Sequence, residues 1–142
     1  MSLPTAQTEV RPDAPDMRAR PAVAVSGAYK VFGKRPKEAV AKLRAGASRD
    51  DVKALGTAAV IDASFEVRQG EIFVVMGLSG SGKSTLIRML NGLNSTTDGS
   101  ITVLGEEVVG RDAKDLRDLR RRSMSMVFQH FALLPHRTVI EN

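Results

Sequence analysis

The chain has 142 residues and a mass of 15.3 kDa, which suits one domain or a piece of a larger one. It has no cysteine, so disulfides, thiolate metal sites and cysteine nucleophiles are excluded. The net charge of +5 raises the question of a nucleic-acid partner. Its excess lies in residues 30–53 and 111–122, without a series of interleaved aromatics on which bases could stack, so no nucleic acid is expected.

The N-terminal residues differ in composition from the rest of the chain. Four of the six prolines lie in residues 1–21, mixed with small and charged side chains, which predicts a disordered leader. Its acidic residues argue against a mitochondrial presequence. A first strand is expected to begin at Ala22–Val25 and to end near Tyr29–Gly33.

A polar segment then separates this strand from the next. Residues 36–55 predict two short helices, because Pro36 suits a first helical position and Ser48 can cap a second helix that ends at Gly56. Residues 59–67 alternate partly between apolar and polar side chains, which favours a strand.

The middle of the chain has a strand, loop and helix pattern. Gln69–Gly70 predicts a turn, and the apolar run Glu71–Met76 predicts a strand of the buried type. Ser84–Leu93 predicts a helix that is apolar on most sides. After a turn at 97–99, another strand is expected over Ser100–Leu104.

The last part of the chain predicts a helix, a strand and the start of a further helix. Asp112–Arg122 is amphipathic, and the run Arg120-Arg121-Arg122 suits the solvated C-terminal end of that helix. Ser123–Phe128 predicts a strand. Thr138 and Glu141 resemble a capping box that opens a helix, four residues before the sequence stops. We therefore expect the chain to be a fragment of a longer protein.

A loop rich in glycine and serine follows the expected strand Glu71–Met76. It matches the pattern Gly, four residues, Gly-Lys-Ser/Thr, and its residues are Gly77, Leu78, Ser79, Gly80, Ser81, Gly82, Lys83, Ser84 and Thr85. Glycine allows backbone angles that a Cβ would oppose, so amide N–H groups can approach phosphate oxygens closely. The positive end of the following helix dipole favours the same anion. The sequence therefore predicts a nucleoside triphosphate site rather than a surface turn.

Three side chains of this loop have separate expected roles. Lys83 would reach the β- and γ-phosphates, and the Ser84 hydroxyl is a hard oxygen ligand for Mg²⁺. Thr85 would support the loop and the α-phosphate. The loop does not identify the class of nucleotide-binding protein, because small-molecule kinases, GTPases, DNA-repair ATPases and transporter ATPases all have one.

Longer stretches carry a more specific resemblance. GEIFVVMGLSGSGKSTLIRMLNGL, TDGSITVLG and SMSMVFQHFALLPHRTVIEN together resemble the nucleotide-binding domain of ATP-binding cassette (ABC) transporters. The start AYKVFG and the insertion after it resemble a narrower branch, the ATPase subunits of glycine betaine/proline importers. The resemblance implies an α/β P-loop NTPase fold of the ABC type, of which the chain holds the N-terminal part with an incomplete sheet.

The resemblance also implies a domain organisation. A leader of residues 1–21 would precede a partial nucleotide-binding domain of residues 22–142. Within that domain, residues 34–57 would form a helical insertion and residues 77–85 the phosphate loop. Residues 129–142 would contain the family's Q-loop and the start of a helical subdomain.

Further residue roles come from the same resemblance. Phe32 aligns with the aromatic that stacks on adenine, and Tyr29 is the alternative. Gln129 resembles the Q-loop glutamine, which would ligate Mg²⁺ and orient the attacking water, so Gln129 and Lys83 are the expected catalytic residues. His130 and His136 are six residues apart without carboxylate partners and are not expected to bind a metal. The apolar residues expected either to face a membrane subunit or to join the core are Phe131, Leu133 and Leu134.

The parent protein is expected to bind ATP and Mg²⁺ and to work as a homodimer on the cytoplasmic face of the plasma membrane, with permease subunits and a solute-binding protein. The family's signature motif, its Asp-Glu strand and its switch histidine do not occur in this sequence, so the chain alone is expected to bind nucleotide without measurable turnover. Three alternatives remain open: an importer for another solute, a non-transport P-loop enzyme such as a small-molecule kinase, and a non-catalytic nucleotide-binding module.

Overall fold

The computed structural model describes residues 20–128 and 136–141. The chain forms two compact units, Met1–Gly110 and Arg111–Asn142, and each is described by itself. Nearly all of the expected leader lies outside the described residues. In the parts of the chain that the structure describes, every helix is too short or too polar to cross a bilayer.

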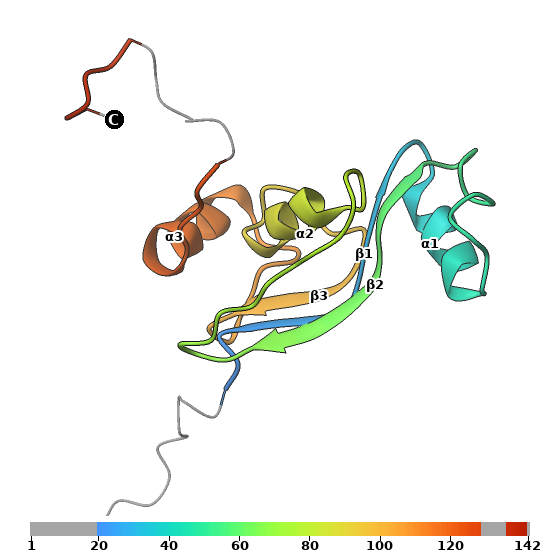
Figure 1. Cartoon of the computed structure of the whole chain (residues 1–142), viewed down its shortest axis with the longest axis horizontal. Helices are drawn as coiled ribbons and strands as arrows, with labels where there is room; N and C mark the ends of the chain where they lie inside the picture. The colour runs from blue at the N-terminus through green and yellow to red at the C-terminus, as the bar shows by residue number, and fades with distance from the viewer. Residues whose placement is uncertain (1–19, 129–135, 142) are drawn as a thin grey trace, which may run out of the picture. The chain divides into compact units, whose positions relative to one another are not determined.

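The first unit is built on an antiparallel sheet with the strand order β2-β1-β3-β4 (Figure 1). The strands are β1 (Val23–Phe32), β2 (Thr57–Val67), β3 (Asp98–Val103) and β4 (Glu106–Glu107). β1 is central and pairs with β2 on one side and β3 on the other, which confirms the strands expected near the start of the chain and over residues 59–67. β3 begins before its expected start, because Asp98 already pairs with Tyr29 of β1.

The insertion between β1 and β2 has its own small core. Helix α1 (Pro36–Arg44) begins with proline and buries Ala39, Val40 and Leu43 on one face. These side chains cluster with residues of both neighbouring strands and of the following turns, namely Tyr29, Val31, Val52, Leu55 and Ala58. This cluster holds the insertion against the C-terminal end of β1 and the N-terminal end of β2 (Figure 1).

The second helix expected in the insertion is wrong. Ser48 and Asp51 form reciprocal hydrogen bonds, as at a helix start, but residues 49–55 form turns. Two of the backbone bonds in this segment span three residues, and the single bond across four residues ends at Gly56.

Two glycines bring the ends of the insertion together. A Cβ on Gly33 would lie 2.5 Å from Cα of Gly56, and a Cβ on Gly56 would lie 2.5 Å from the carbonyl oxygen of Phe32. The two backbones therefore touch at this point, and larger residues would force them apart. Arg44, at the end of α1, pairs with Asp98 of β3 at 3.1 Å, which adds a solvent-exposed ion pair between the insertion and the sheet.

Helix α2 (Lys83–Leu90) confirms the helix expected after the phosphate loop, although it ends before Leu93. It contacts β2 and β3, and Met89 is fully buried. The buried strand expected over Glu71–Met76 is wrong: this segment has no strand hydrogen bonds and Ile72 is 89% exposed. A strand requires partner strands to take its backbone N–H and C=O groups, and none of the described residues pairs with this segment.

The second unit contains helix α3 (Ala113–Ser123), which confirms the expected amphipathic helix. Asp112 caps it by accepting hydrogen bonds from the backbone N–H groups of residues 114 and 115 at 2.9 and 2.8 Å. The strand expected over Ser123–Phe128 is wrong, since residues 124–128 have no regular structure and Val127 is 97% exposed. Beyond the gap in the described residues, the backbone N–H of Thr138 donates to the carboxylate of Glu141 at 2.9 Å, and the N–H of Glu141 donates to the Thr138 hydroxyl at 3.4 Å. These are the bonds of the expected capping box, but residues 139–141 form a turn, and the described residues do not contain the helix that the box was expected to open.

Candidate nucleotide-binding site

The phosphate loop lies tightly against strand β2. Gly82 has φ +98°, a conformation that side chains rarely adopt, and a Cβ there would lie 2.1 Å from the carbonyl oxygen of Ala59. Gly82 is also the residue that caps α2, and no side chain there satisfies the first N–H groups of the helix. These amide donors and the helix dipole together suit an anion such as a phosphate.

Lys83 holds the loop in its curved shape. Its Nζ donates hydrogen bonds to the carbonyl oxygens of Gly77 and Leu78, at 2.8 and 2.7 Å. A lysine ammonium has three N–H donors, so one of them is not used by these two carbonyls. The turn itself is closed by a bond from the Ser81 N–H to the carbonyl oxygen of Leu78, at 3.2 Å. The side chain of Lys83 and the backbone of the loop therefore hold each other in place.

The loop and the start of α2 form one wall of a cavity of about 250 Å³. The cavity is lined by the loop and helix residues Gly80, Gly82, Lys83, Ser84 and Thr85, by Thr57, Ala58 and Ala59 of β2, and by Arg49 of the insertion. Ligand pockets for drug-sized molecules have volumes of about 300–1,000 Å³, so this one is sized for part of a nucleotide, such as its phosphates.

The structure thus brings five of the predicted binding residues to one cavity. Gly77, Ser79, Ser81 and Phe32 are not among its lining residues, although Gly77 is joined to Lys83 through its carbonyl oxygen. Arg49 lines the cavity and was not expected from the sequence, where it was one of several basic residues in the insertion. Its position depends on the fold of the insertion, which no local pattern reveals.

The two aromatic candidates for adenine stacking have different surroundings. Tyr29 is buried in the core of the insertion, whereas the ring of Phe32 is 45% exposed. Phe32 is paired with Thr57, a cavity-lining residue, so the two side chains project from the same face of the sheet. Phe32 therefore has both the exposure and the location for a base-stacking role, and that role stays a prediction.

A buried lysine lies against the Phe32 ring. Nζ of Lys30 is 4.9 Å from the ring centroid, within the range of a cation–π interaction. The same ammonium donates to the carbonyl oxygen and the hydroxyl of Ser95, at 2.5 and 3.2 Å. Burial lowers the pKa of Lys30 below its ordinary value, because the charged form loses solvation. The Lys30 ammonium is therefore held between Ser95 and the Phe32 ring.

The donors around the cavity are compatible with Mg²⁺. The described residues contain no group of three His, Asp, Glu or Cys side chains that could hold a metal by themselves. Mg²⁺ takes few protein ligands, however, and fills its coordination sphere with water and substrate phosphates. The Ser84 hydroxyl, exposed at the start of α2 and lining the cavity, is the kind of oxygen donor that such a site uses.

Several predicted residues lie outside the described part of the chain. They are Gln129, His130, Phe131, Leu133 and Leu134, and their predicted roles stay predictions. His136 is described and lies in a turn.

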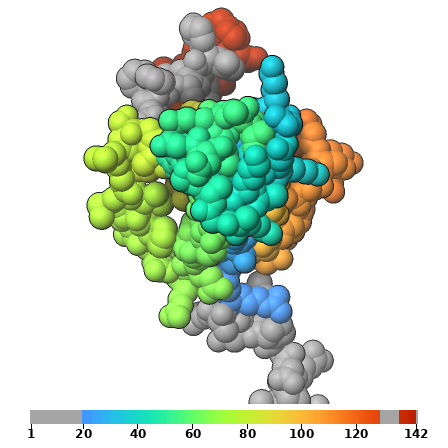
Figure 2. All heavy atoms as spheres, turned by 90° about the vertical axis from the view of Figure 1, so that its right-hand side faces the viewer, coloured from blue at the N-terminus to red at the C-terminus, as the bar shows by residue number. Residues whose placement is uncertain are grey.

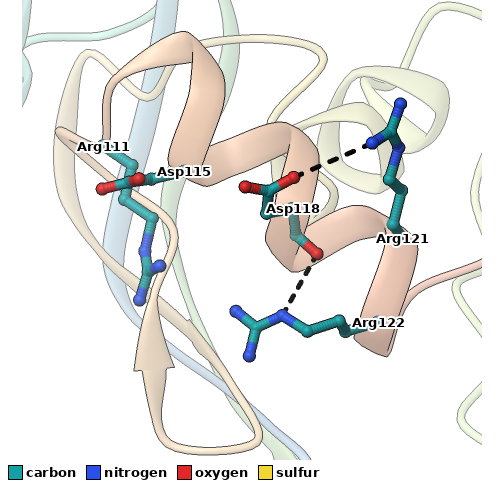
Figure 3. A pocket seen from close by; sticks show the side chains of 5 residues that line it. All are labelled: Arg111, Asp115, Asp118, Arg121 and Arg122. Carbon is teal, nitrogen blue, oxygen red and sulfur yellow. Dashed lines mark hydrogen bonds and ion pairs between the residues drawn. The ribbon is translucent and has the colours of Figure 1, made fainter.

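A second cavity, of about 380 Å³, lies along α3 (Figure 3). All five of its lining residues are charged, and two of those on the helix interact with each other: Arg121 pairs with Asp118 at 4.0 Å. Nε of Arg122 donates to the carbonyl oxygen of Asp118 at 3.3 Å. The expected solvated helix end is confirmed for Arg121 and Arg122 but not for Arg120, whose Nε is buried. The cavity offers no feature that selects a ligand.

The glycine-rich loop, its lysine and the helix that follows define the chain as a P-loop nucleotide-binding protein. Residues 60–142 match the family model described as ABC transporter, and the chain belongs to this family. The non-transport P-loop enzymes, such as small-molecule kinases, are therefore not favoured.

Two relatives show where in the family the chain lies. It is 51% identical over 122 residues to the glycine betaine transport ATP-binding protein OpuAA of Bacillus subtilis, a match that covers 84% of this chain and 29% of the relative. It is 49% identical over 123 residues to the trimethylamine N-oxide transport system ATP-binding protein TmoW of Ruegeria pomeroyi, covering 86% of this chain and 36% of the relative. The chain therefore spans about a third of the length of these relatives.

A solved structure confirms the fold class. The ATP-binding cassette MJ0796, in a dimeric post-hydrolysis state bound to ADP and Pi, superposes with a TM-score of 0.67 and 24% sequence identity. The superposition covers 84% of this chain and 44% of that cassette. The chain has the α/β fold of the ABC cassette, with a sheet that represents part of the cassette.

Proposed function

We propose that the chain is the nucleotide-binding part of an ABC importer subunit that couples ATP binding and hydrolysis to the uptake of glycine betaine and related osmoprotectants. The observation that carries the proposal is the 51% identity to OpuAA over 84% of the chain, a stretch too long to be confined to the phosphate loop. The second relative, TmoW, is named for transport of trimethylamine N-oxide. The solutes in both names are small and carry a trimethylated nitrogen, which supports this class over other importer substrates.

ATP would bind with its phosphates along the loop. The amide N–H groups between Gly77 and Gly82 and the helix dipole of α2 would bind the phosphate oxygens, and the remaining donor of Lys83 would reach the β- and γ-phosphates. The cavity holds only part of a nucleotide, so the base would lie outside it, stacked on the exposed face of Phe32.

Mg²⁺ would be bound by the Ser84 hydroxyl together with phosphate oxygens, and by Gln129. When bound, Mg²⁺ neutralises charge that develops on the phosphates during transfer of the γ-phosphoryl group. Thr85 would hold the α-phosphate end of the ligand, and Gln129 would orient the attacking water. The chain lacks the family's signature motif and Asp-Glu strand, so it should bind nucleotide without measurable turnover when assayed alone.

Transport requires partners that this chain does not itself provide. The ATPase subunit would dimerise, as the related cassette MJ0796 does, and would bind permease subunits at the cytoplasmic face of the membrane. A solute-binding protein would deliver the osmoprotectant. Closure of the ATPase dimer around two nucleotides would then drive the permease.

Uptake of labelled solute in the host tests this proposal. Cells grown at high osmolarity that carry Lys83→Ala in the encoded protein should lose accumulation of radiolabelled glycine betaine, while cells carrying Lys37→Ala, which changes an exposed insertion residue, should keep it. Loss of accumulation of an amino acid such as methionine, with glycine betaine uptake intact, would assign the protein to another importer class.

A further inference from the structure

The nucleotide cavity is lined by a cation that does not belong to the phosphate loop. Arg49 belongs to the insertion between β1 and β2, yet it lines the same cavity as Lys83 and Ser84. Figure 2 looks onto the insertion, drawn in cyan to green, from the side on which α1 lies in Figure 1. The insertion therefore forms a wall of the site.

The acidic residues next to Arg49 are held by other groups. Asp50 pairs with Nζ of Lys53 at 2.9 Å. Asp51 accepts hydrogen bonds from the backbone N–H and the hydroxyl of Ser48, at 2.8 and 2.7 Å. Among the described residues no carboxylate lies within ion-pair distance of Arg49, so its positive charge is not neutralised locally.

The position of Arg49 is fixed by the packing of the insertion. The turn that carries it is anchored by the Ser48–Asp51 bonds and by Val52 and Leu55, which are buried in the core shared with β1 and β2. Gly33 and Gly56 fasten the base of the insertion, where their backbones touch. The backbone that carries Arg49 is therefore held next to the cavity, while its side chain is exposed and accessible to a ligand.

We propose that Arg49 binds a phosphate group of the nucleotide in the cavity that it lines together with Lys83, so that the insertion contributes a residue to nucleotide recognition. A guanidinium has five N–H donors in a planar fork and remains charged at physiological pH, which suits two oxygens of one phosphate. The proposal rests on the proposed nucleotide site, because Arg49 would bind the same ligand as the loop.

The test compares ATP affinity in three variants by isothermal titration calorimetry. Arg49→Gln should raise the dissociation constant for ATP about five- to tenfold, since charge-assisted hydrogen bonds at a solvent-accessible site are lost. Arg49→Lys should recover part of that loss, because it restores the charge without the fork. Lys37→Gln removes the same charge from an exposed position of α1 that does not line the cavity, and it should change affinity by less than about twofold.

Ligand truncation separates the possible contacts. Affinity for adenosine, which has no phosphate, should be equal in the wild type and Arg49→Gln. If Arg49 binds the α-phosphate, Arg49→Gln should also bind AMP more weakly than the wild type does. Equal ATP affinity in Arg49→Gln and the wild type would overturn the proposal, as would an equal loss with adenosine. If the wild type does not bind ATP, or Lys83→Ala binds it as tightly as the wild type, the nucleotide site itself is wrong. Equal far-ultraviolet circular dichroism of the variants controls for folding.

Discussion

The close contact between Gly82 and strand β2 predicts a large effect of Gly82→Ala on nucleotide binding. The added Cβ would lie 2.1 Å from the carbonyl oxygen of Ala59, whereas real Cβ atoms essentially never come closer than 3.0 Å to a neighbouring atom. The loop would have to move away from β2 by about 0.9 Å. Such a shift lengthens an amide–phosphate hydrogen bond of about 2.9 Å beyond about 3.5 Å. Two lost bonds of about 1.5 kcal/mol each amount to roughly a hundredfold in ATP affinity.

Gly46→Ala provides a matched control. Gly46 has φ +94°, almost the same as the +98° of Gly82, but nothing lies within 4 Å of the position of its Cβ. Both alanines would carry backbone strain of about 1–2 kcal/mol, visible as a lower midpoint of urea unfolding. Calorimetric titration with ATP should show the hundredfold loss in Gly82→Ala alone. If the two variants bind ATP within about threefold of each other, contact with β2 does not set the position of the loop.

Three further substitutions test other parts of the account. Phe32→Ala should weaken ATP binding about five- to tenfold and lower the urea midpoint only slightly, because Phe32 is 45% exposed; unchanged ATP affinity with a large drop in the midpoint would make Phe32 a packing residue. Asp112→Ala should destabilise α3 by about 1 kcal/mol and reduce its helical circular dichroism, and an unchanged spectrum would contradict the capping role. Hydrogen bonds from Ser48 lower the pKa of Asp51 in the folded protein. These bonds therefore stabilise the fold above a pH of about 4, the ordinary pKa of an aspartate in the unfolded chain, and this stabilisation is lost as the pH falls through the lower pKa of the folded state. Ser48→Ala should therefore lose less stability than the wild type on acidification, and identical acid titrations of unfolding would refute this.

The phosphate loop could be predicted from sequence because its determinants are local. Its glycines, Lys83 and the first residues of α2 follow one another in the chain, and the structure places α2 directly after the loop. The cap of α3 is equally local, since Asp112 acts on N–H groups two and three residues away, although the sequence pattern predicted the helix and not its capping residue. In both cases neighbouring residues supply the groups that satisfy one another.

The strands expected over Glu71–Met76 and Ser123–Phe128 failed for the opposite reason. An apolar run shows that burying the segment would be energetically favourable, but a strand forms only where neighbouring strands pair with its backbone N–H and C=O groups. The described residues pair with neither segment. In the first segment Phe73 instead stacks on Phe65 of β2, with centroids 4.7 Å apart, while Ile72 remains exposed.

Arg49 could not be predicted as a cavity residue because its location depends on distant contacts. In the sequence it lies 34 residues before Lys83, among other basic residues of the insertion. The buried cluster around Val40 and Leu55, and the contact between Gly33 and Gly56, bring it to the cavity. Charge patterning identified the segment as basic, but the fold determines which of its cations faces the site.

Binding of ATP by the 142-residue chain tests the central claim most directly. Calorimetric titration in the presence of Mg²⁺ should give saturable binding to the wild type and a loss of at least about a hundredfold in Lys83→Ala, where both the phosphate contact and the two loop hydrogen bonds are removed. Equal affinities of the wild type and Lys83→Ala, with both proteins folded, would contradict the assignment of this loop as the nucleotide site.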